Sequence, residues 1–312
     1  MKADGPIGIA LVGIGKIARD QHVPTLARSS DFELMATVSR NARLEETLGY
    51  KSLSDAFAHH PEINAVVLCT PPGVHYAQAC EALRAGRHVF LEKPPTASLA
   101  ELASLKRLAK KTGLTLYTSW HSRFAAAVAP AREWLANGKI QSVVINWREN
   151  VRKWHPGQDW IFEPGGMGVF DPGINALSIA TQILPWDFKL QDASLTVPKN
   201  RQAPIAASLR YAGEDGVPVV AEFDFRENNS EVWEITVVTD QGEMKLSAGG
   251  AKMSINGDAC LVDSTRSEYE GLYSRFAELV KERTSEIDAT PLVHVADAFL
   301  MGKRIVTDDF DW

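Results

Sequence analysis

Residues 7–18 read IGIALVGIGKIA, and this stretch decides the fold of the first half of the chain. Its first six residues, Ile7–Val12, are apolar almost without interruption, as in a strand buried on both faces of a parallel sheet. Over about 120 residues, short apolar runs then alternate with helical segments, which is typical of parallel βαβ units. The further expected strands are Phe32–Val38, Ala65–Cys69, His88–Leu91 and Leu114–Thr118, and the expected helices are Lys16–Ser29, His75–Ala85 and Leu99–Lys111. The sequence therefore predicts an α/β domain with a doubly wound parallel sheet.

Residues 13–18 carry a glycine pattern that binds dinucleotides when it stands between a strand and a helix. They match G-x-G-x-x-G/A, with Ala18 in the last place. Gly13 permits the tight turn, Gly15 lets a pyrophosphate approach the backbone, and Ala18 lets the helix pack close to the sheet. The free N–H groups at the helix start favour negative charge. We expect Gly13, Gly15, Lys16 and Ile17 to bind a dinucleotide; the alternative is a glycine turn with a structural role alone.

The end of the second strand indicates which dinucleotide is used. A site specific for NAD places Asp or Glu there to hold the ribose 2′-hydroxyl, whereas this chain has Ser39 and Arg40. A hydroxyl and a guanidinium can bind a 2′-phosphate, and Arg43 is near enough to assist. The alternative is that Arg40 stacks on the adenine or faces water. We predict that NADP is used at least as well as NAD, which nothing here repels.

A lysine follows the fourth expected strand, in Glu92-Lys93-Pro94-Pro95. Ligands of open α/β sheets bind beyond the carboxyl ends of the strands, so Lys93 can stabilise a developing alkoxide or relay its proton. The alternative is a surface lysine in a loop. At the end of the third strand, His75 of Thr70-Pro71-Pro72-Gly73-Val74-His75 is expected to begin a helix near the cofactor; a capping or packing role explains it equally well.

After Trp120 the pattern changes and strands dominate. Val217–Phe225 alternates, with Glu222, Asp224 and Arg226 on the polar face, and Thr239–Gly242 is expected to form a hairpin turn. Late helices are expected at Tyr269–Arg283 and Val293–Val306. The sequence predicts two domains: residues 1–122, and an α+β domain over residues 123–312 whose last helix can pack back on the first.

Asp171 and Asn175 follow a glycine-rich stretch of the second domain and stand four residues apart. If a helix begins at Pro172, Asp171 is its N-cap, and that is the structural alternative to a functional role. Asn175 lies one turn further on the same face, so the two side chains can together hold vicinal hydroxyls.

Three more polar residues stand beside tryptophans: His121 after Trp120, Glu149 near Trp147, and His155 after Trp154. Sugar sites combine aromatic faces with carboxylate, amide and imidazole groups, and these residues are therefore candidates for substrate binding. The alternative for each histidine is a satisfied structural residue. The chain has no metal-binding signature, such as paired cysteines or HExxH.

Composition excludes several classes of protein. The 312 residues are 45% hydrophobic and 23% charged, which is typical of a globular protein of this size. The net charge of -6 disfavours nucleic-acid binding. No apolar run is long enough for a membrane span, and no cleavage site follows Ile7–Val12. With three cysteines in no framework spacing, we expect a cytoplasmic protein.

The motifs together resemble the glucose–fructose oxidoreductase / inositol dehydrogenase family (Gfo/Idh/MocA). The residues that carry the resemblance are Gly13–Ala18, Thr70-Pro71-Pro72 with His75, and Glu92-Lys93-Pro94. The resemblance implies a Rossmann domain joined to an open-faced, mostly antiparallel sheet, through which a homodimer or homotetramer forms. It also implies that Thr70, Pro71, His75, Glu92 and Lys93 contact NAD or NADP.

The activity that the resemblance implies is oxidation of the anomeric hydroxyl of an aldose to a lactone. Asp171 then accepts the proton, Lys93 offsets the charge on O1, and His121, Glu149, His155 and Asn175 hold the sugar. The family pattern ends Asp-x-x-x-His, and here Asn175 replaces the histidine. The competing hypotheses are another reduction, such as that of an imine, on the same fold, and a non-catalytic protein that senses sugar or NADP.

Overall fold

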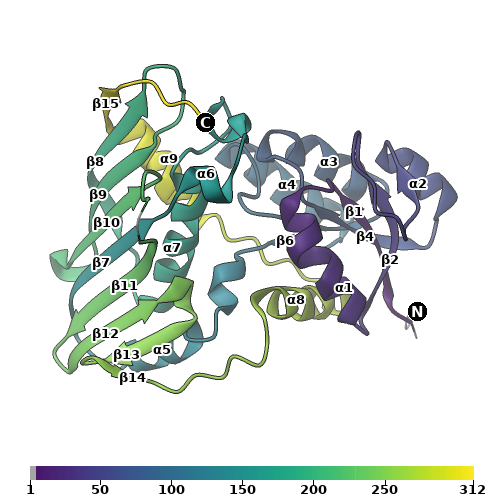
Figure 1. The fold of residues 1–312 in the computed structure, drawn as a ribbon. Helices are drawn as coiled ribbons and strands as arrows, with labels where there is room; N and C mark the ends of the chain where they lie inside the picture. Colours follow the sequence, from purple (N-terminus) through teal and green to yellow (C-terminus); the bar gives the residue numbers. More distant parts are fainter. Residues whose placement is uncertain (1–4, 229) are drawn as a thin grey trace. The chain divides into compact units, whose positions relative to one another are not determined.

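The computed structural model describes residues 5–228 and 230–312, which divide into two compact units. The first unit contains the chain up to Trp120 and also Tyr269–Asp288, and the second contains His121–Glu268 and Ala289–Trp312 (Figure 1). A single boundary at residue 122 therefore leaves out the return of the chain to the first unit. Among the described residues, no helix is long and apolar enough to cross a membrane.

The first unit contains a six-stranded sheet in the order β3-β2-β1-β4-β5-β6, and every pair of neighbours is parallel. This is the strand order of a Rossmann fold, as expected. The strands are β1 (Ile7–Val12), β2 (Phe32–Val38), β3 (Gly49–Tyr50), β4 (Ile63–Leu68), β5 (His88–Leu91) and β6 (Leu116–Thr118). The helices are α1 (Val23–Arg28), α2 (Leu53–His59), α3 (Pro72–Arg84) and α4 (Leu99–Thr112).

The expected helix over Lys16–Ser29 is divided in two. Ala18–His22 forms a π-helical turn, and α1 begins only at Val23. Pro24 stands in the first turn of α1, where its missing N–H removes no bond that the helix needs. Because the π turn is wider than an α turn, it changes which side chains face the core, and His22 is completely buried.

Helix α8 (Glu268–Glu282) explains why residues 269–288 belong to the first unit. Tyr269, Tyr273 and Phe276 follow one another at helical spacing and are all buried. The ring of Tyr273 stacks on Phe90 of β5 at 5.4 Å between centroids. Burying one large apolar side chain stabilises a fold by about 1.5–3 kcal/mol, so this row is a substantial part of the core. The last helix, α9 (Thr290–Met301), belongs to the second unit.

The second unit contains a nine-stranded mixed sheet in the order β14-β13-β12-β11-β7-β10-β9-β8-β15. Only β10–β7 and β15–β8 are parallel among the pairs of the described residues, so the sheet is mostly antiparallel, as expected. The strands are β7 (Ile140–Arg148), β8 (Lys189–Pro198), β9 (Ala206–Ala212), β10 (Pro218–Asp224), β11 (Val232–Thr239), β12 (Gly242–Ser247), β13 (Lys252–Ile255), β14 (Asp258–Ala259) and β15 (Lys303–Thr307).

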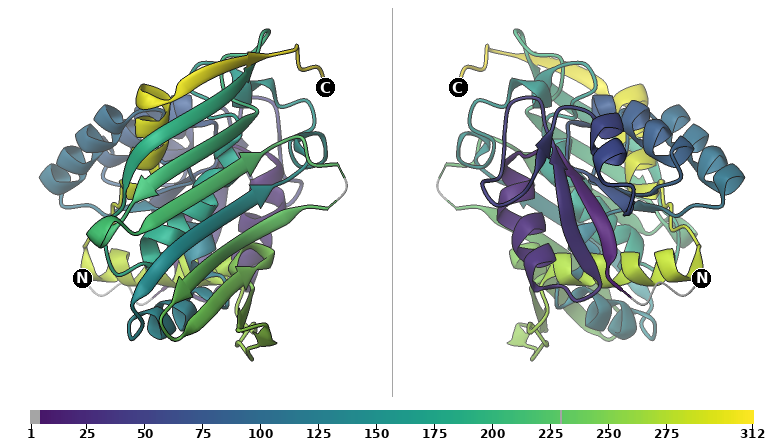
Figure 2. Two further views of the ribbon diagram at one scale, coloured as in Figure 1. Left: turned by 90° about the vertical axis from the view of Figure 1, so that its left-hand side faces the viewer. Right: turned by 90° about the vertical axis from the view of Figure 1, so that its right-hand side faces the viewer.

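Helices cover one face of this second sheet. They are α5 (Val128–Leu135), α7 (Phe170–Ile183) and α9, and they lie behind the strands in the left view of Figure 2. The hairpin turn expected at Thr239–Gly242 is present, because Thr239 pairs with Gly242 across a two-residue loop. The polar side chains of β10 occupy alternate positions to the buried ones, as expected for a sheet with one open face.

Two expected elements of the second unit are wrong. The helix predicted over Val293–Val306 ends at Met301, and Lys303–Thr307 forms the edge strand β15. The β-branched run Ile305-Val306-Thr307 favours the strand. Asp171 is also not an N-cap, because α7 begins at Phe170 and Val169 takes the cap position.

Candidate active site

The turn after β1 has the geometry of a phosphate-binding turn. Gly13 has a φ of +86°, and a Cβ there would lie 2.8 Å from Cγ2 of Thr70 and 2.9 Å from the carbonyl carbon of Cys69. A side chain is therefore excluded by both conformation and space. At the exposed Gly15, by contrast, a Cβ would meet no atom within 4 Å. The space that a side chain would fill at Gly15 is the place where a pyrophosphate approaches the backbone, so the residues fit a dinucleotide.

Lys16 and Ile17 lie on the exposed side of this turn. Lys16 forms an ion pair with Asp20 on the first turn of the helix. Ile17 is 37% exposed, which is unusual for a large aliphatic side chain so close to the core. Both residues are accessible to a ligand bound at Gly15.

Ser39 and Arg40 follow β2, where the structure separates their roles. The hydroxyl of Ser39 accepts a hydrogen bond from the backbone N–H of Ala42 at 3.2 Å, so it stabilises the turn. Arg40 is exposed on the same turn, and within the described residues no acidic side chain forms an ion pair with it. Of the two, Arg40 is the residue that has a side chain available for a 2′-phosphate.

The segment after β4 holds Thr70, Pro71 and His75. The Thr70 hydroxyl donates to Oε1 of Gln78 at 2.7 Å, and Pro71 is exposed at the N-terminus of α3. His75 is completely buried in α3, and its Nδ1 lies 3.2 Å from the carbonyl oxygen of Pro95. Burial lowers the pKa of His75, so the ring is neutral at pH 7. This placement favours the packing role for His75.

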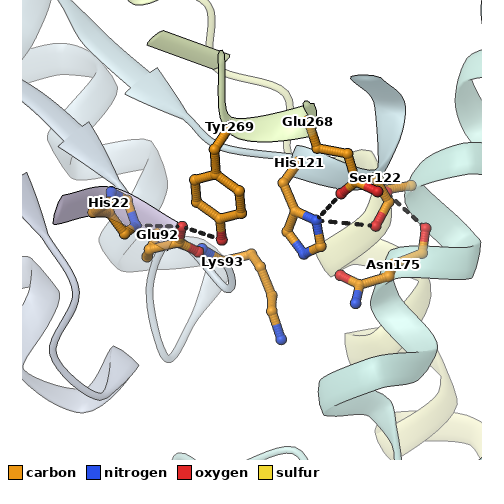
Figure 3. A network of polar contacts seen from close by, with 9 residues as sticks. His22, Glu92, Lys93, His121, Ser122, Asn175, Glu268 and Tyr269 are labelled. Atoms are coloured by element: carbon orange, nitrogen blue, oxygen red, sulfur yellow. Dashed lines mark hydrogen bonds and ion pairs between the residues drawn. The ribbon is translucent and has the colours of Figure 1, made fainter. Parts of the chain in front are cut away.

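Glu92 is a buried carboxylate at the end of β5 (Figure 3). It is 3% exposed; Oε1 lies 3.0 Å from Nε2 of His22 and accepts a hydrogen bond from the Tyr269 hydroxyl at 2.9 Å. Its other oxygen accepts the backbone N–H of Lys93 at 2.9 Å. Glu92 thus faces the interior of the first unit and fixes the backbone of the lysine that follows it.

The Tyr273 hydroxyl and the Cys69 thiol near this carboxylate stay neutral at physiological pH. Burial raises the pKa of the Tyr273 hydroxyl well above its ordinary value, and the nearby Cys69 and Glu92 raise it further. Burial also raises the pKa of the Cys69 thiol, with a second contribution from Glu92. The Tyr273 hydroxyl in turn lies 2.8 Å from Nδ1 of His22. His22 thus joins the Tyr273 hydroxyl to Glu92, and these buried contacts hold the carboxylate that fixes Lys93.

Sequence reasoning missed His22, Tyr269 and Tyr273 as parts of this support. His22 and Glu92 are 70 residues apart in the chain, and His22 and Tyr273 are 251 apart. No spacing rule connects such positions. The apolar spacing of α8 was visible, but not the sheet against which it packs.

In the second unit, His155 stands beside two buried carboxylates. Its Nε2 lies 3.6 Å from Oδ2 of Asp171 and 3.8 Å from Oε1 of Glu149. Asp171 projects from the first turn of α7, two residues after the N-cap residue Val169. The helix begins early because Gly168 turns the chain at a φ of +55°, where a Cβ would lie 2.1 Å from the Pro204 carbonyl oxygen. The structural alternative for Asp171, a helix cap, is therefore excluded.

Two tryptophans donate hydrogen bonds to carboxylates in this part of the second unit. The indole N–H of Trp233 donates to Oε2 of Glu149 at 3.0 Å. The indole N–H of Trp154 donates to Oε1 of Glu231, and Nζ of Lys153 lies 2.8 Å from Oε2 of the same carboxylate. Sequence reasoning placed an aromatic group beside these residues but did not find Trp233.

Asn175 and His121 complete the predicted set in the second unit. Asn175 is half-buried on α7, one turn after Asp171, as expected. His121 begins a short 3-10 turn, and its Nδ1 lies 2.5 Å from Oε2 of Glu268 and 3.3 Å from the Ser122 hydroxyl (Figure 3). The described residues contain no group of three or more His, Cys, Asp or Glu side chains that could hold a metal ion.

The fold and these two sets of residues define a nicotinamide-dependent oxidoreductase. A family model described as an oxidoreductase family with an NAD-binding Rossmann fold (GFO_IDH_MocA) matches residues 7–119. Galactose 1-dehydrogenase from Pseudomonas fluorescens is 42% identical over 305 residues, which are 98% of this chain and 99% of the relative. The chain belongs to the Gfo/Idh/MocA oxidoreductase family.

Solved structures agree with this assignment. The crystal structure of D-galactose-1-dehydrogenase from Rhizobium etli has a TM-score of 0.94 and 49% sequence identity, and the match covers 100% of both chains. A 3-ketoreductase from Actinomadura kijaniata, crystallised with NADP and TDP-benzene, has a TM-score of 0.84 over 97% of this chain and 100% of its own. At 18% identity, the second structure supports the fold alone.

Proposed function

We propose that the protein is a D-galactose 1-dehydrogenase, which oxidises the anomeric hydroxyl of the sugar to the lactone with NAD or NADP. The observation that carries the proposal is the group of His155, Glu149 and Asp171, because it offers an imidazole and two carboxylates to a polyhydroxylated substrate. The galactose dehydrogenases that match this chain over nearly its whole length support the choice of sugar.

Asp171 is the proposed base. A hemiacetal hydroxyl is more acidic than an ordinary alcohol, so a carboxylate is a sufficient acceptor for its proton. The side chain is 6% exposed, and its Oδ2 lies 3.6 Å from Nε2 of His155. When bound, the nicotinamide accepts the hydride from C1.

Lys93 is proposed to stabilise the negative charge that develops on O1 as the proton leaves. Its backbone N–H donates to Glu92, and its side chain is half-buried. The point from which the side chain extends is therefore fixed. Glu149, His155, Asn175 and His121 are proposed to hold the ring hydroxyls so that C1–H is oriented for transfer.

The sugar preference follows from which hydroxyls are held. D-galactose, L-arabinose and D-fucose share their configuration at C2, C3 and C4, whereas D-glucose is inverted at C4. We expect the first three sugars to be oxidised and D-glucose to be about 10- to 100-fold poorer in kcat/KM, because the inverted hydroxyl leaves a buried polar group unpaired, at about 1–3 kcal/mol.

Initial rates of NADP reduction at 340 nm across these four aldoses test the proposal. Glucose oxidised as well as galactose would contradict the C4 argument. A strong preference for L-arabinose would assign the chain as an L-arabinose 1-dehydrogenase instead. Tight NADP binding without turnover on any aldose would favour a sensing protein.

Cofactor choice gives a second expected result. We expect Arg40→Asp to raise the KM for NADP far more than the KM for NAD, because the carboxylate repels a 2′-phosphate and can hold a 2′-hydroxyl. Arg107→Asp, at an exposed position of α4, is the matched control and should leave both constants unchanged. Equal changes in the two constants for Arg40→Asp would show that Arg40 does not contact the 2′-phosphate.

We also propose a homodimer or homotetramer formed through the open face of the second sheet, in the cytoplasm. This face carries paired charges; Arg226, for example, donates to both carboxylate oxygens of Asp224 at 2.9 and 2.7 Å. Arginine is enriched at protein interfaces, and the rim of an interface is polar. Light scattering of the purified protein measures the oligomeric state.

The three cysteines are free thiols, which is consistent with a reducing compartment such as the cytoplasm.

A further inference from the structure

His155 occupies an unusual electrostatic position. Its Nε2 lies 3.6 Å from one carboxylate and 3.8 Å from another, and these belong to different elements: Asp171 to α7 and Glu149 to the residue after β7. The side chains of Asp171 and Glu149 are only 6% and 7% exposed, whereas that of His155 is 19% exposed. The ring of Phe225 packs against the imidazole at 5.9 Å between centroids.

Two carboxylates this deeply buried disfavour each other's ionised form. Burial and a like charge both favour protonation of one member of such a pair. The indole N–H of Trp233 stabilises Glu149 by a hydrogen bond but brings no positive charge. An imidazolium facing both carboxylates brings that charge, and it allows both to remain ionised.

The local fold holds the imidazole in this position. His155 follows the short helix α6 (Val151–Trp154), and its backbone N–H donates to the Val151 carbonyl oxygen at 2.8 Å. Glu149 is fixed by its own N–H, which donates to the Asp224 carbonyl oxygen at 2.9 Å. The backbones that carry the ring and the Glu149 carboxylate are therefore both held by hydrogen bonds.

We infer that His155 is a positioning residue that carries a proton in the resting enzyme and keeps Asp171 ionised, and therefore able to act as the base. The inference rests on the proposed function for the role of Asp171. As the hydride leaves C1, the O1–H bond breaks and an O–H bond forms on Asp171, while His155 keeps its proton on Nε2. The proton on Asp171 is then released to water before the next turnover.

The same geometry explains how this chain works with an asparagine at position 175. Asn175 stands one turn beyond Asp171 on α7, and an amide carries no positive charge at any pH near neutrality. His155 supplies an imidazole to the same carboxylate from outside α7, at the residue that follows α6.

The charge on His155 can be measured without sugar or turnover. In long-range 1H–15N NMR spectra of the full-length protein, the His155 signals are those lost in His155→Gln. We expect the ring to remain protonated to a pH at least about one unit above the ordinary histidine pKa of about 6.5. Glu149→Gln should lower the midpoint of His155. A His155 ring that titrates at or below about pH 6.5 would overturn the inference, whether or not galactose is the substrate.

The pH dependence of kcat/KM distinguishes an effect of the charge on His155 from an effect of its packing. In His155→Gln, the acid limb of the kcat/KM profile should move to higher pH by about one unit or more, because Asp171 loses the cation that keeps it ionised. Adding Glu149→Gln to this variant removes the competing carboxylate and should move the limb back toward that of the wild type. The inference would be contradicted if His155→Gln left the acid limb unchanged. It would also be contradicted if the limb of the double variant stayed at the pH of the single variant. Absence of aldose oxidation by the wild type would instead overturn the proposed function, and the NMR titration would still decide this inference.

Discussion

Replacing Lys93 by alanine is expected to lower kcat on galactose by about two orders of magnitude or more. That is the scale on which enzymes lose rate when a positioned charge that stabilises a developing oxyanion is removed. The reason to expect a large effect is the construction beneath the lysine: a buried Glu92, held by His22 and Tyr269, fixes the Lys93 backbone.

The matched control for this variant is Lys106→Ala, which removes an exposed lysine from α4. Single-turnover rates and NADP affinity should be measured for both variants. A kcat for Lys93→Ala within about threefold of the wild-type value would show that Lys93 is the surface lysine of the alternative interpretation.

Asp171→Asn and Asp171→Ala should each lower kcat by a similar factor, about two orders of magnitude or more, because neither side chain can accept the proton of the anomeric hydroxyl. Because asparagine has nearly the shape of aspartate, Asp171→Asn should still fold, which its thermal unfolding curve checks. NADP affinity should change little in both variants.

Asp192→Asn, on the exposed part of β8, is the control for a carboxylate lost elsewhere in the second unit. Near-normal turnover of Asp171→Asn would remove Asp171 from the reaction. A large fall in Tm with normal turnover in the remaining folded protein would assign it a structural role.

The first unit was predictable from the sequence because its signals are local. The buried strands β1 and β4 are short apolar runs, and Gly13 and Pro71 mark where they end. The alternation of strands and helices indicates a doubly wound parallel sheet, and the glycine pattern places the phosphate-binding turn without any knowledge of distant residues.

The missed features depend on contacts between distant parts of the chain. The return of α8 to the first unit joins Tyr273 to Phe90 across more than half the sequence. The start of α7 depends on the close approach of Gly168 to Pro204. A cap rule based on Pro172 alone therefore places the start of the helix after Asp171, whereas the helix begins at Phe170. For β15, the apolar spacing of α9 continued past Gly302 and concealed the change to a strand.

The sequence identified the candidate residues of the second unit by their chemical type. Their arrangement in space is shown only by the structure. Sequence reasoning chose His155, Glu149 and Asp171 because such groups bind sugars. It could not place both carboxylates within 4 Å of Nε2 of His155, since Glu149 follows a strand, His155 follows a short helix and Asp171 lies on a long helix.

The position of oxidation is the central claim, and [1-2H]-D-galactose tests it most directly. Incubated with the enzyme and NADP, the labelled sugar should transfer its deuterium to the nicotinamide, show a primary isotope effect in the rate of the chemical step, and give galactonolactone without deuterium. Mass spectrometry of NADPH and of the sugar product measures all of the label. Deuterium retained in an oxidised sugar would contradict the account, because it would place the reaction at a carbon other than C1.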